Sequence, residues 1–245
     1  MMGKHEARYY RCPDCGFVAV ADPVWLSEAY KNPIAQIDIG SLWRACRYSA
    51  VVKSLINFGG FRRGGRFLDY GAGFGLFVRR MRDLGYDFRG YDAHTDNIFA
   101  VGFEGNVNGG ERFELLTALE VFEHLQDPLS LIEQMAQISS TIIFSTELIA
   151  EPAPAVGEWW YYAPVTGQHI SFYSRRSLQG IARRLGLNFY TCGKEIHMLS
   201  SKVIPQALFA LLSTPALAKW LDLFWPRPTL LFQDFNQGMT NSRQP

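Results

Sequence analysis

The residues from Asp69 to Gly75, which read Asp-Tyr-Gly-Ala-Gly-Phe-Gly, have the types and spacing of a ligand-binding turn. Gly71, Gly73 and Gly75 stand at alternate positions between a short apolar run and a helical pattern. Glycine adopts positive φ without strain, and because it lacks a Cβ a ligand can approach the backbone closely. The following helix would present its unpaired N–H groups at the same place. The sequence therefore predicts a strand-to-helix turn, with Ala72 inside it, that holds a nucleoside-containing cofactor.

The exact glycine spacing separates two kinds of cofactor. A dinucleotide fingerprint, G-x-G-x-x-G, would place its third glycine at position 76, where this chain has Leu76. Asp69 also disfavours a pyrophosphate, because a carboxylate beside phosphates costs Coulomb energy, whereas one beside a cationic ligand gains it. We therefore expect a ligand with a positive end, and a dehydrogenase is the disfavoured alternative.

Two further blocks follow the glycine turn. Asp92 ends the run Phe88-Arg89-Gly90-Tyr91-Asp92 about twenty residues after Gly71, where an acid can accept both hydroxyls of a ribose. The third block runs from Leu115 to Leu125, and Asp127 and Pro128 follow it. Together the three blocks resemble the class I S-adenosylmethionine-dependent methyltransferases, whose first motif is an acid followed by G-x-G-x-G. The resemblance covers roughly residues 65 to 200.

This resemblance implies a cofactor, a set of contacts and a fold. S-adenosylmethionine is the expected cofactor, and Glu120, at the end of a predicted strand, faces either its ammonium end or the substrate; the alternative is a solvated carboxylate. The expected fold is a Rossmann-like α/β fold with a seven-stranded, mostly parallel sheet and helices on both faces. The cofactor-binding residues are expected to be Asp69, Gly71, Ala72, Gly73, Gly75, Asp92 and Glu120.

Apolar periodicity supports alternating strands and helices over residues 37–203, the predicted methyltransferase domain. Asp127 and Ser174 have the residue types of helix N-caps, and Gly186 follows the second of these helices. Residues 188–194 and 196–203 are close enough in sequence to pair as a hairpin at one edge of the sheet. Within the domain, residues 148–173 are irregular and rich in aromatic side chains, and we expect them to form a lid on the substrate side.

The two ends of the chain extend beyond this domain. Residues 1–36 are expected to be irregular, with Cys12 and Cys15 in a C-x-x-C knuckle that supplies half of a zinc site. Cys46 and His5 are the candidates to complete it, and the alternative is a metal-free turn. Residues 204–245 form a helical extension with a loose tail, which packs on its own domain, on a second subunit as a homodimer, or on a membrane surface.

Methyl transfer needs alignment and exclusion of water, with a base when the acceptor must lose a proton. His169 and His124 are the candidate bases, and for each the alternative is a histidine that fixes a loop by hydrogen bonding. His169 begins His169-Ile170-Ser171-Phe172, a segment that resembles an H-x-S-F motif of the family. Tyr162, together with Tyr161, is expected to orient the acceptor.

Composition excludes several other classes of function. The chain has 245 residues and a net charge of +1, so it has no electrostatic signature of nucleic-acid binding. No apolar run is long enough for a membrane span, the N-terminus has no signal-peptide pattern, and four cysteines do not indicate a disulfide framework. The expected location is therefore the cytoplasm.

The sequence predicts an S-adenosylmethionine-dependent methyltransferase that transfers a methyl group to oxygen or carbon of a small-molecule, sugar-like acceptor. The alternative is a catalytically inactive, methyltransferase-like binding or regulatory protein, since holding a cofactor is separable from using it.

Overall fold

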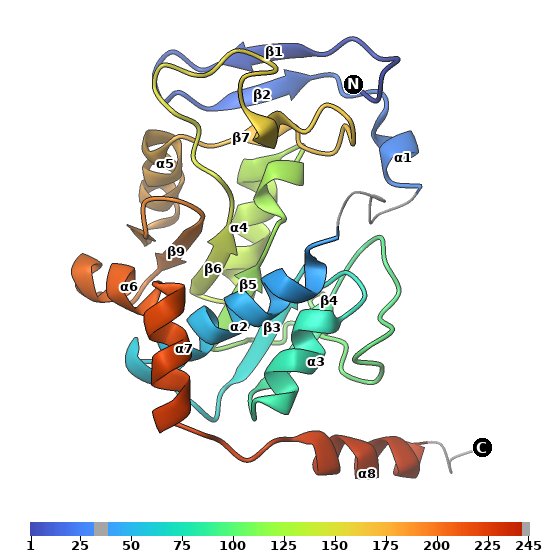
Figure 1. Ribbon diagram of the computed structural model, residues 1–245, viewed down its shortest axis with the longest axis vertical. Coiled ribbons are helices and arrows are strands. Elements are labelled where there is room, and N and C mark those ends of the chain that lie inside the picture. The colour runs from blue at the N-terminus through green and yellow to red at the C-terminus, as the bar shows by residue number, and fades with distance from the viewer. Residues whose placement is uncertain (32–38, 242–245) are drawn as a thin grey trace.

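The computed structural model describes residues 1–31 and 39–241. Figure 1 shows three parts: a small β-layer that contains the N-terminus, a central sheet with helices, and a C-terminal helix at the opposite end of the molecule. The predicted boundary between residues 36 and 37 lies outside the described residues, and so do residues 242–245 at the end of the predicted extension.

The central sheet has six strands in the order β4-β3-β5-β6-β9-β8. Among the described strands of this sheet, β9 alone runs antiparallel to both of its neighbours, and β8 pairs with it as the predicted edge hairpin. The α/β fold is thereby confirmed. The strands are β3 (Arg66–Tyr70), β4 (Asp87–Tyr91), β5 (Leu115–Ala118), β6 (Thr141–Ser145), β8 (Asn188–Thr191) and β9 (Ile196–Ser200).

Over residues 1–31 and 39–241 the sheet has six strands and not the seven expected from the family resemblance. Beyond β4 a single parallel bridge joins Gly90 to Glu104, at the edge where a seventh strand would pair. The chain near that bridge contains Gly102, Gly105, Gly109 and Gly110 among mostly polar residues. Glycine loses more conformational entropy than other residues in a strand and has no side chain to pack, and asparagine fits a pleated surface poorly, so both are uncommon in strands. The segment therefore forms loops at this edge.

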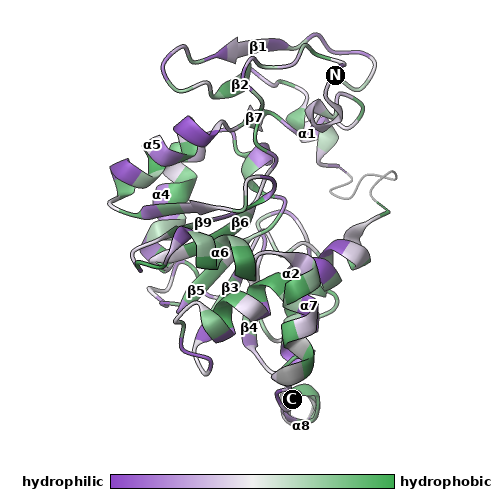
Figure 2. Ribbon diagram, turned by 60° about the vertical axis from the view of Figure 1, so that its left-hand side comes forward, coloured by the Kyte–Doolittle hydropathy of each residue, from purple (hydrophilic) through white to green (hydrophobic). Residues whose placement is uncertain are grey.

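Helices cover both faces of the sheet, and alternate strand residues point into two separate cores. Phe67 of β3 belongs to the core beneath α2 and α3, whereas its neighbour Leu68 belongs to the core beneath α4 and α5. Hydrophobic residues follow the length of α2 and α7, which lie side by side on the first face (Figure 2). The first face carries α2 (Ser41–Phe58), α3 (Leu76–Asp83), α6 (Gln206–Leu212) and α7 (Pro215–Phe224), and the second carries α4 (Pro128–Ile138) and α5 (Arg175–Leu185).

Two helices on the second face begin with the predicted caps. Asp127 accepts a hydrogen bond from the Ser130 N–H at 3.2 Å, and Pro128 occupies the first turn of α4. Ser174 accepts from the Ser177 N–H at 3.0 Å at the start of α5. Gly186 ends α5 in the left-handed region, with φ 66°. These contacts satisfy donors and acceptors that the helix ends leave unpaired.

The N-terminal segment is not irregular, so that prediction was wrong. Its strands β1 (Arg8–Arg11) and β2 (Val18–Ala21) pair with β7 (Ser171–Phe172) in an antiparallel sheet, and a short helix α1 (Leu26–Ala29) follows. The predicted lid supplies β7, and its buried side chains share a hydrophobic cluster with Val18 and Val20. Four-residue strands carry too little periodicity to be recognised alone, and here a partner distant in sequence stabilises them.

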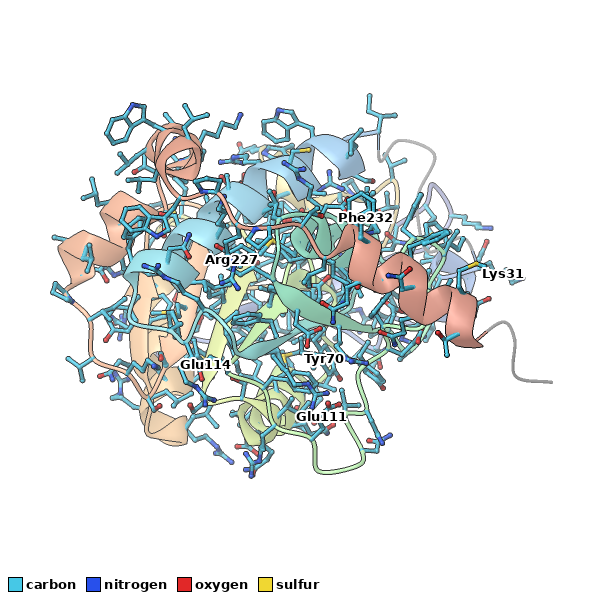
Figure 3. All side chains as sticks on the ribbon, turned by 90° about the horizontal axis from the view of Figure 1, so that it is seen from below. Lys31, Tyr70, Glu111, Glu114, Arg227 and Phe232 are labelled. Carbon is cyan, nitrogen blue, oxygen red and sulfur yellow. The ribbon has the colours of Figure 1, made fainter. Side chains whose placement is uncertain are left out.

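The C-terminal extension packs on the first face of the sheet and then crosses the underside of the molecule. Phe209 of α6 and Ala218 of α7 are buried in the core with α2. The last helix, α8 (Leu231–Asn241), extends past Phe235, so the predicted loose tail is helical over the described residues. Seen from below, α8 lies on the near side of the molecule, with the labelled Phe232 in its first turn (Figure 3). Asp234 attaches α8 to the domain by accepting hydrogen bonds from the buried Arg82.

Candidate active site

A cavity of about 830 Å³ lies where the parallel strands of the sheet end. Its walls come from the residues after β3, β4, β5 and β6, from the start of α2, and from the aromatic segment 160–169. In the sheet β3 lies between β4 and β5, and the chain passes from β3 first to β4 on one side of it and then to β5 on its other side. The cavity therefore lies at a topological switch point, where open α/β sheets bind ligands.

The glycine turn borders this cavity. Gly71 and Gly73 line it, with φ 74° and 54°, whereas Ala72 and Gly75 are not among the lining residues. A Cβ at Gly71 would lie 2.5 Å from Cγ2 of Val121, and one at Gly75 would collide with Asn97, so both glycines are required by packing. A Cβ at Gly73 would meet nothing within 4 Å. Gly73 therefore leaves open space for a ligand against its backbone.

Asp92 lies directly after β4 and also lines the cavity. Its Oδ2 accepts a hydrogen bond from the Gly73 N–H at 2.8 Å, and its Oδ1 accepts from the N–H groups of His94 and Thr95 at 2.8 and 2.9 Å. These three bonds hold the carboxylate rigidly beside the glycine turn. The structure thus brings the first two sequence blocks together, and the ribose contact of Asp92 stays a prediction.

Asp69, the acid of the first motif, is buried beneath the turn and does not line the cavity. Its Oδ1 accepts a hydrogen bond from the Thr117 hydroxyl at 2.6 Å. Burial raises the pKa of Asp69 to about 7, and the nearby charge of Asp92 acts in the same direction. The residue therefore supports the turn from below, and the direct contact with a cationic ligand expected from the sequence is not part of this geometry.

Glu120 lies on the opposite side of the turn and lines the cavity. Its backbone has a positive φ of 55°, which is uncommon for a residue other than glycine. Its Oε1 accepts hydrogen bonds from the hydroxyls of Tyr48 at 2.9 Å and Ser145 at 2.6 Å, and its Oε2 lies 4.0 Å from Nε of Arg44. An uncommon backbone geometry and three partners fix this carboxylate at the cavity wall.

Both predicted bases line the cavity, and their rings are 5.0 Å apart. Nδ1 of His124 lies 3.1 Å from the Gln168 carbonyl oxygen, and Nδ1 of His169 lies 2.7 Å from the Tyr161 carbonyl oxygen. The Tyr30 hydroxyl also lies 3.1 Å from Nδ1 of His124. Because a carbonyl only accepts, each Nδ1 carries the proton and each Nε2 carries a lone pair. Burial lowers the pKa of His124 to about 3 and also lowers that of His169, so both rings are neutral near pH 7.

Tyr162 lies outside the cavity, although the sequence favoured it as an orienting residue. Its hydroxyl donates to the Pro154 carbonyl at 2.9 Å, and its ring packs against Phe172 in the N-terminal layer. The neighbouring Tyr161 lines the cavity instead. Adjacent aromatic residues in a short 3₁₀ turn (Trp160–Tyr162) point in different directions, and sequence alone does not show which one faces the site.

Several lining residues were not recognised in the sequence. Arg47 pairs with Glu195 through a hydrogen bond of 2.8 Å from Nη1, and its guanidinium lies over the Trp43 ring. The sequence pattern placed this helix beside the cofactor site through its apolar residues, but it did not show which charged residues at the start of α2 meet the cavity. The unrecognised lining residues include Tyr30, Arg44, Arg47, His94, Glu147 and Glu195, whereas Trp160 belongs to the predicted lid, and Trp43 and Tyr48 belong to a helical pattern expected to pack beside the cofactor site.

The C-x-x-C knuckle has no third metal ligand among the described residues. Cys12 and Cys15 are free thiols in the turn between β1 and β2. Of the two residues proposed to complete the site, His5 lies 3.2 Å from Glu28 and Cys46 is exposed on α2. The zinc site predicted there is therefore not supported.

The fold and the cavity define the class of protein. A glycine turn after the first strand of the central sheet, an acid after the second and a cavity at the switch point are the arrangement of the class I S-adenosylmethionine-dependent methyltransferases. A methyltransferase-domain family model matches residues 43–191, more than half of the chain. The chain therefore belongs to this methyltransferase family. No curated protein matches it.

One solved structure agrees on the fold at low sequence identity, and two others are more distantly similar. The 1,6-didemethyltoxoflavin-N1-methyltransferase of Burkholderia thailandensis is 14% identical, with a TM-score of 0.51 over 80% of this chain and 97% of that chain. The magnesium protoporphyrin IX methyltransferase of Synechocystis PCC 6803 is 13% identical, with a TM-score of 0.43 over 71% and 88%. CalO1, a calicheamicin-biosynthesis methyltransferase, is 12% identical, with a TM-score of 0.44 over 63% of this chain and 54% of that chain, so the match spans about half of CalO1.

Within the described residues, no helix has the length and hydropathy needed to cross a membrane.

Proposed function

We propose that the protein transfers a methyl group from S-adenosylmethionine to oxygen or carbon of a small, sugar-like acceptor. The observation that carries this proposal is the shared cavity: the open backbone at Gly73, the fixed carboxylate of Asp92 and two neutral histidines all border one space.

The cofactor side of the cavity is assigned to the glycine turn. Gly73 offers close backbone approach, and Asp92 and Glu120 place two carboxylates on either side of the turn. Carboxylates favour a ligand that carries positive charge, as S-adenosylmethionine does at its sulfonium and its ammonium group. The B. thailandensis enzyme, which has the same fold, was solved with bound S-adenosylhomocysteine, and this supports the assignment.

The acceptor side is assigned to the wall formed by α2 and segment 160–169. Trp43 and Trp160 line the cavity and remain largely exposed, at 63% and 71%. Flat aromatic faces beside the carboxylates of Glu147 and Glu195 suit a ring that carries several hydroxyl groups, because the ring stacks and the hydroxyls donate.

The cofactor supplies an activated methyl group, and the chain's residues align the acceptor and exclude water. When the acceptor is a hydroxyl, Nε2 of His169 is the proposed proton acceptor, because its Nδ1–H is committed to the Tyr161 carbonyl. Tyr161, which lines the same part of the cavity, is the proposed orienting residue for the acceptor.

Thermal denaturation with S-adenosylhomocysteine tests the cofactor assignment, because a ligand that binds only the folded chain raises the melting temperature. We expect a rise with S-adenosylhomocysteine, none with NAD, and loss of the rise in Asp92→Ala. Asp96→Ala, an exposed acid in the same loop, is the matched control and should retain it. A wild-type protein that does not respond to S-adenosylhomocysteine would contradict the proposal. Binding without S-adenosylhomocysteine release from S-adenosylmethionine, across a panel of sugar nucleotides, would favour an inactive binding protein.

We also propose that α8 is a homodimer contact. Leu231, Phe232 and Phe235 of this helix are exposed by 50%, 75% and 65%, and a cluster of apolar residues on one exposed helix suits association with a second copy. Sedimentation should show a dimer for the full chain and a monomer for Phe232→Glu. A monomeric wild-type protein at micromolar concentration would refute this contact.

A further inference from the structure

A buried carboxylate without a well-formed hydrogen bond lies next to the histidines of the cavity. Glu123 is completely buried, at 0% exposure, and neither of its side-chain oxygens has a hydrogen bond of good geometry among the described residues. Burial and the charge of Glu120 raise the pKa of Glu123 well above its ordinary value, while its own backbone N–H and the Tyr161 side chain, as weak hydrogen-bond donors, lower it. Buried carboxylates are normally paired, hydrogen-bonded or bound to a metal ion, so this one requires an explanation.

The two nearest nitrogen ligands are oriented as metal-bound histidines usually are. The imidazoles of His124 and His169 each use Nδ1 toward a backbone carbonyl, at 3.1 and 2.7 Å. A ligating histidine typically has its other ring nitrogen held in this way, which fixes the tautomer and the ring orientation. No two ligand atoms of Glu123, His124 and His169 are farther apart than 4.8 Å.

We propose that Glu123, His124 and His169 bind one divalent transition-metal ion at the acceptor side of the cavity. Among the described residues, these three form the single group of histidine, cysteine and acidic side chains with this proximity. Ligands of a tetrahedral zinc ion are about 3.4 Å apart, given metal–ligand distances of about 2.1 Å, so a contraction of at most about 1.4 Å from the 4.8 Å limit closes the site. Two imidazoles and one carboxylate suit zinc, iron, cobalt or nickel and disfavour magnesium and calcium.

The backbone around the cluster is built to hold its two halves together. Glu123 and His124 belong to the 3₁₀ turn η1 (Phe122–His124), whereas His169 comes from the segment before β7. The Ile170 N–H donates to the Glu123 carbonyl at 2.8 Å, and the Ser171 hydroxyl donates to the Leu125 carbonyl at 2.6 Å. These bonds from the two residues directly after His169 hold it against η1, independently of any ion.

The ion would leave open coordination positions on the cavity side, because both histidines line the cavity and Glu123 lies behind them. This part of the inference rests on the proposed function. An acceptor hydroxyl bound to the ion has a lowered pKa and loses its proton to water in the cavity. Its oxygen then forms the new C–O bond while the S–CH₃ bond breaks and the electron pair stays on sulfur. The ion would thus take over the role given to His169 above.

Zinc binding to the chelator-treated protein tests the site. The background protein carries Cys12→Ser and Cys15→Ser, so that the knuckle thiols do not contribute. Calorimetry with Zn²⁺ at pH 7.5 should show one ion per chain. Glu123→Gln should weaken the affinity on the order of 100-fold, because it removes a direct ligand and even supporting residues are worth 10–100-fold. His94→Gln, a cavity histidine outside the cluster, is the matched control and should bind Zn²⁺ unchanged.

Binding of S-adenosylhomocysteine, followed in parallel, reports folding and separates the two proposals. The metal site is refuted if the background protein does not bind Zn²⁺, or if Glu123→Gln binds Zn²⁺ as tightly as the background protein does, even when both proteins bind S-adenosylhomocysteine. Zinc binding without S-adenosylhomocysteine binding overturns the proposed function and leaves the metal site intact. If Glu123→Gln does not fold, His169→Asn serves as the second variant, with the same expected loss and the same refuting result.

Discussion

The buried acid of the first motif makes the stability of this protein depend on pH in a direction opposite to that of most carboxylates. Asp69 has a pKa of about 7 in the folded chain against an ordinary value of 3.8, mainly because burial disfavours its ionised form. A raised folded-state pKa stabilises the protein below pH 3.8, and this contribution is lost as the pH rises toward 7. We therefore expect Asp69→Asn, which keeps an acceptor for the Thr117 hydroxyl, to remove this loss.

The shift sets the size of the effect. The pKa of Asp69 differs by about three units between the unfolded and the folded chain. This corresponds to a change of about 4 kcal/mol in the free energy of unfolding between the fully protonated and the fully ionised limits. About 1.7 kcal/mol of this is lost by pH 5, and about 2.5 kcal/mol more between pH 5 and pH 8. The stability of Asp69→Asn relative to the wild type should therefore increase by about 2.5 kcal/mol over that interval, whatever the offset between the two proteins at pH 5.

Urea denaturation of both proteins at pH 5, 6, 7 and 8 measures this difference. Other titrating groups cancel, because both proteins contain them. Asp96→Asn, which changes an exposed aspartate of the cofactor-side loop, is the control and should keep a constant offset from the wild type. An offset between Asp69→Asn and the wild type that stays constant from pH 5 to pH 8 would show that Asp69 titrates normally, and would refute the reasoning.

Two further predictions concern the glycine turn and the last helix. Gly73→Ala and Gly102→Ala both place a Cβ at positive φ in open space, so each should cost about 1 kcal/mol of stability. Only Gly73→Ala should weaken S-adenosylhomocysteine binding, by about tenfold, as measured by calorimetry. If Gly73→Ala and Gly102→Ala bound S-adenosylhomocysteine with the same affinity, no ligand would contact Gly73. Asp234→Ala leaves Arg82, which is 3% exposed, with only Asp87 and the Phe88 carbonyl as polar partners. We expect a loss of about 3 kcal/mol and faster proteolysis of α8, and an unchanged melting temperature would contradict this.

Much of the fold could be predicted from the sequence, because local signals and apolar periodicity act over short distances. Asp127, Ser174 and Gly186 mark helix ends by their own side chains or backbone freedom, and each does so in the structure. The glycine turn was recognisable because only glycine tolerates the geometry at Gly71. The edge hairpin also followed from two short runs close in sequence.

The weaker predictions depended on contacts between distant segments. The strands near the N-terminus form because β7, from residues 171–172, completes their sheet, and no local pattern indicates that pairing. A seventh strand was expected from the family and does not form within the part of the chain that the structure describes, where the residues beside β4 are rich in glycine. Tyr162 and Tyr161 have the same residue type, and only the packing of the 3₁₀ turn decides which one meets the cavity.

The sequence by itself determined the class of protein, the cofactor-side turn and the position of Asp92 after the second strand of the central sheet. The tertiary structure alone decided which side chains share the cavity and which acid is buried. It also placed the buried Glu123 beside His169, which is far away in the chain, without a well-formed hydrogen bond to its carboxylate among the described residues. The physical reason is that residue type and spacing control local backbone geometry, whereas burial and the approach of distant ligating atoms exist only after the segments have packed together.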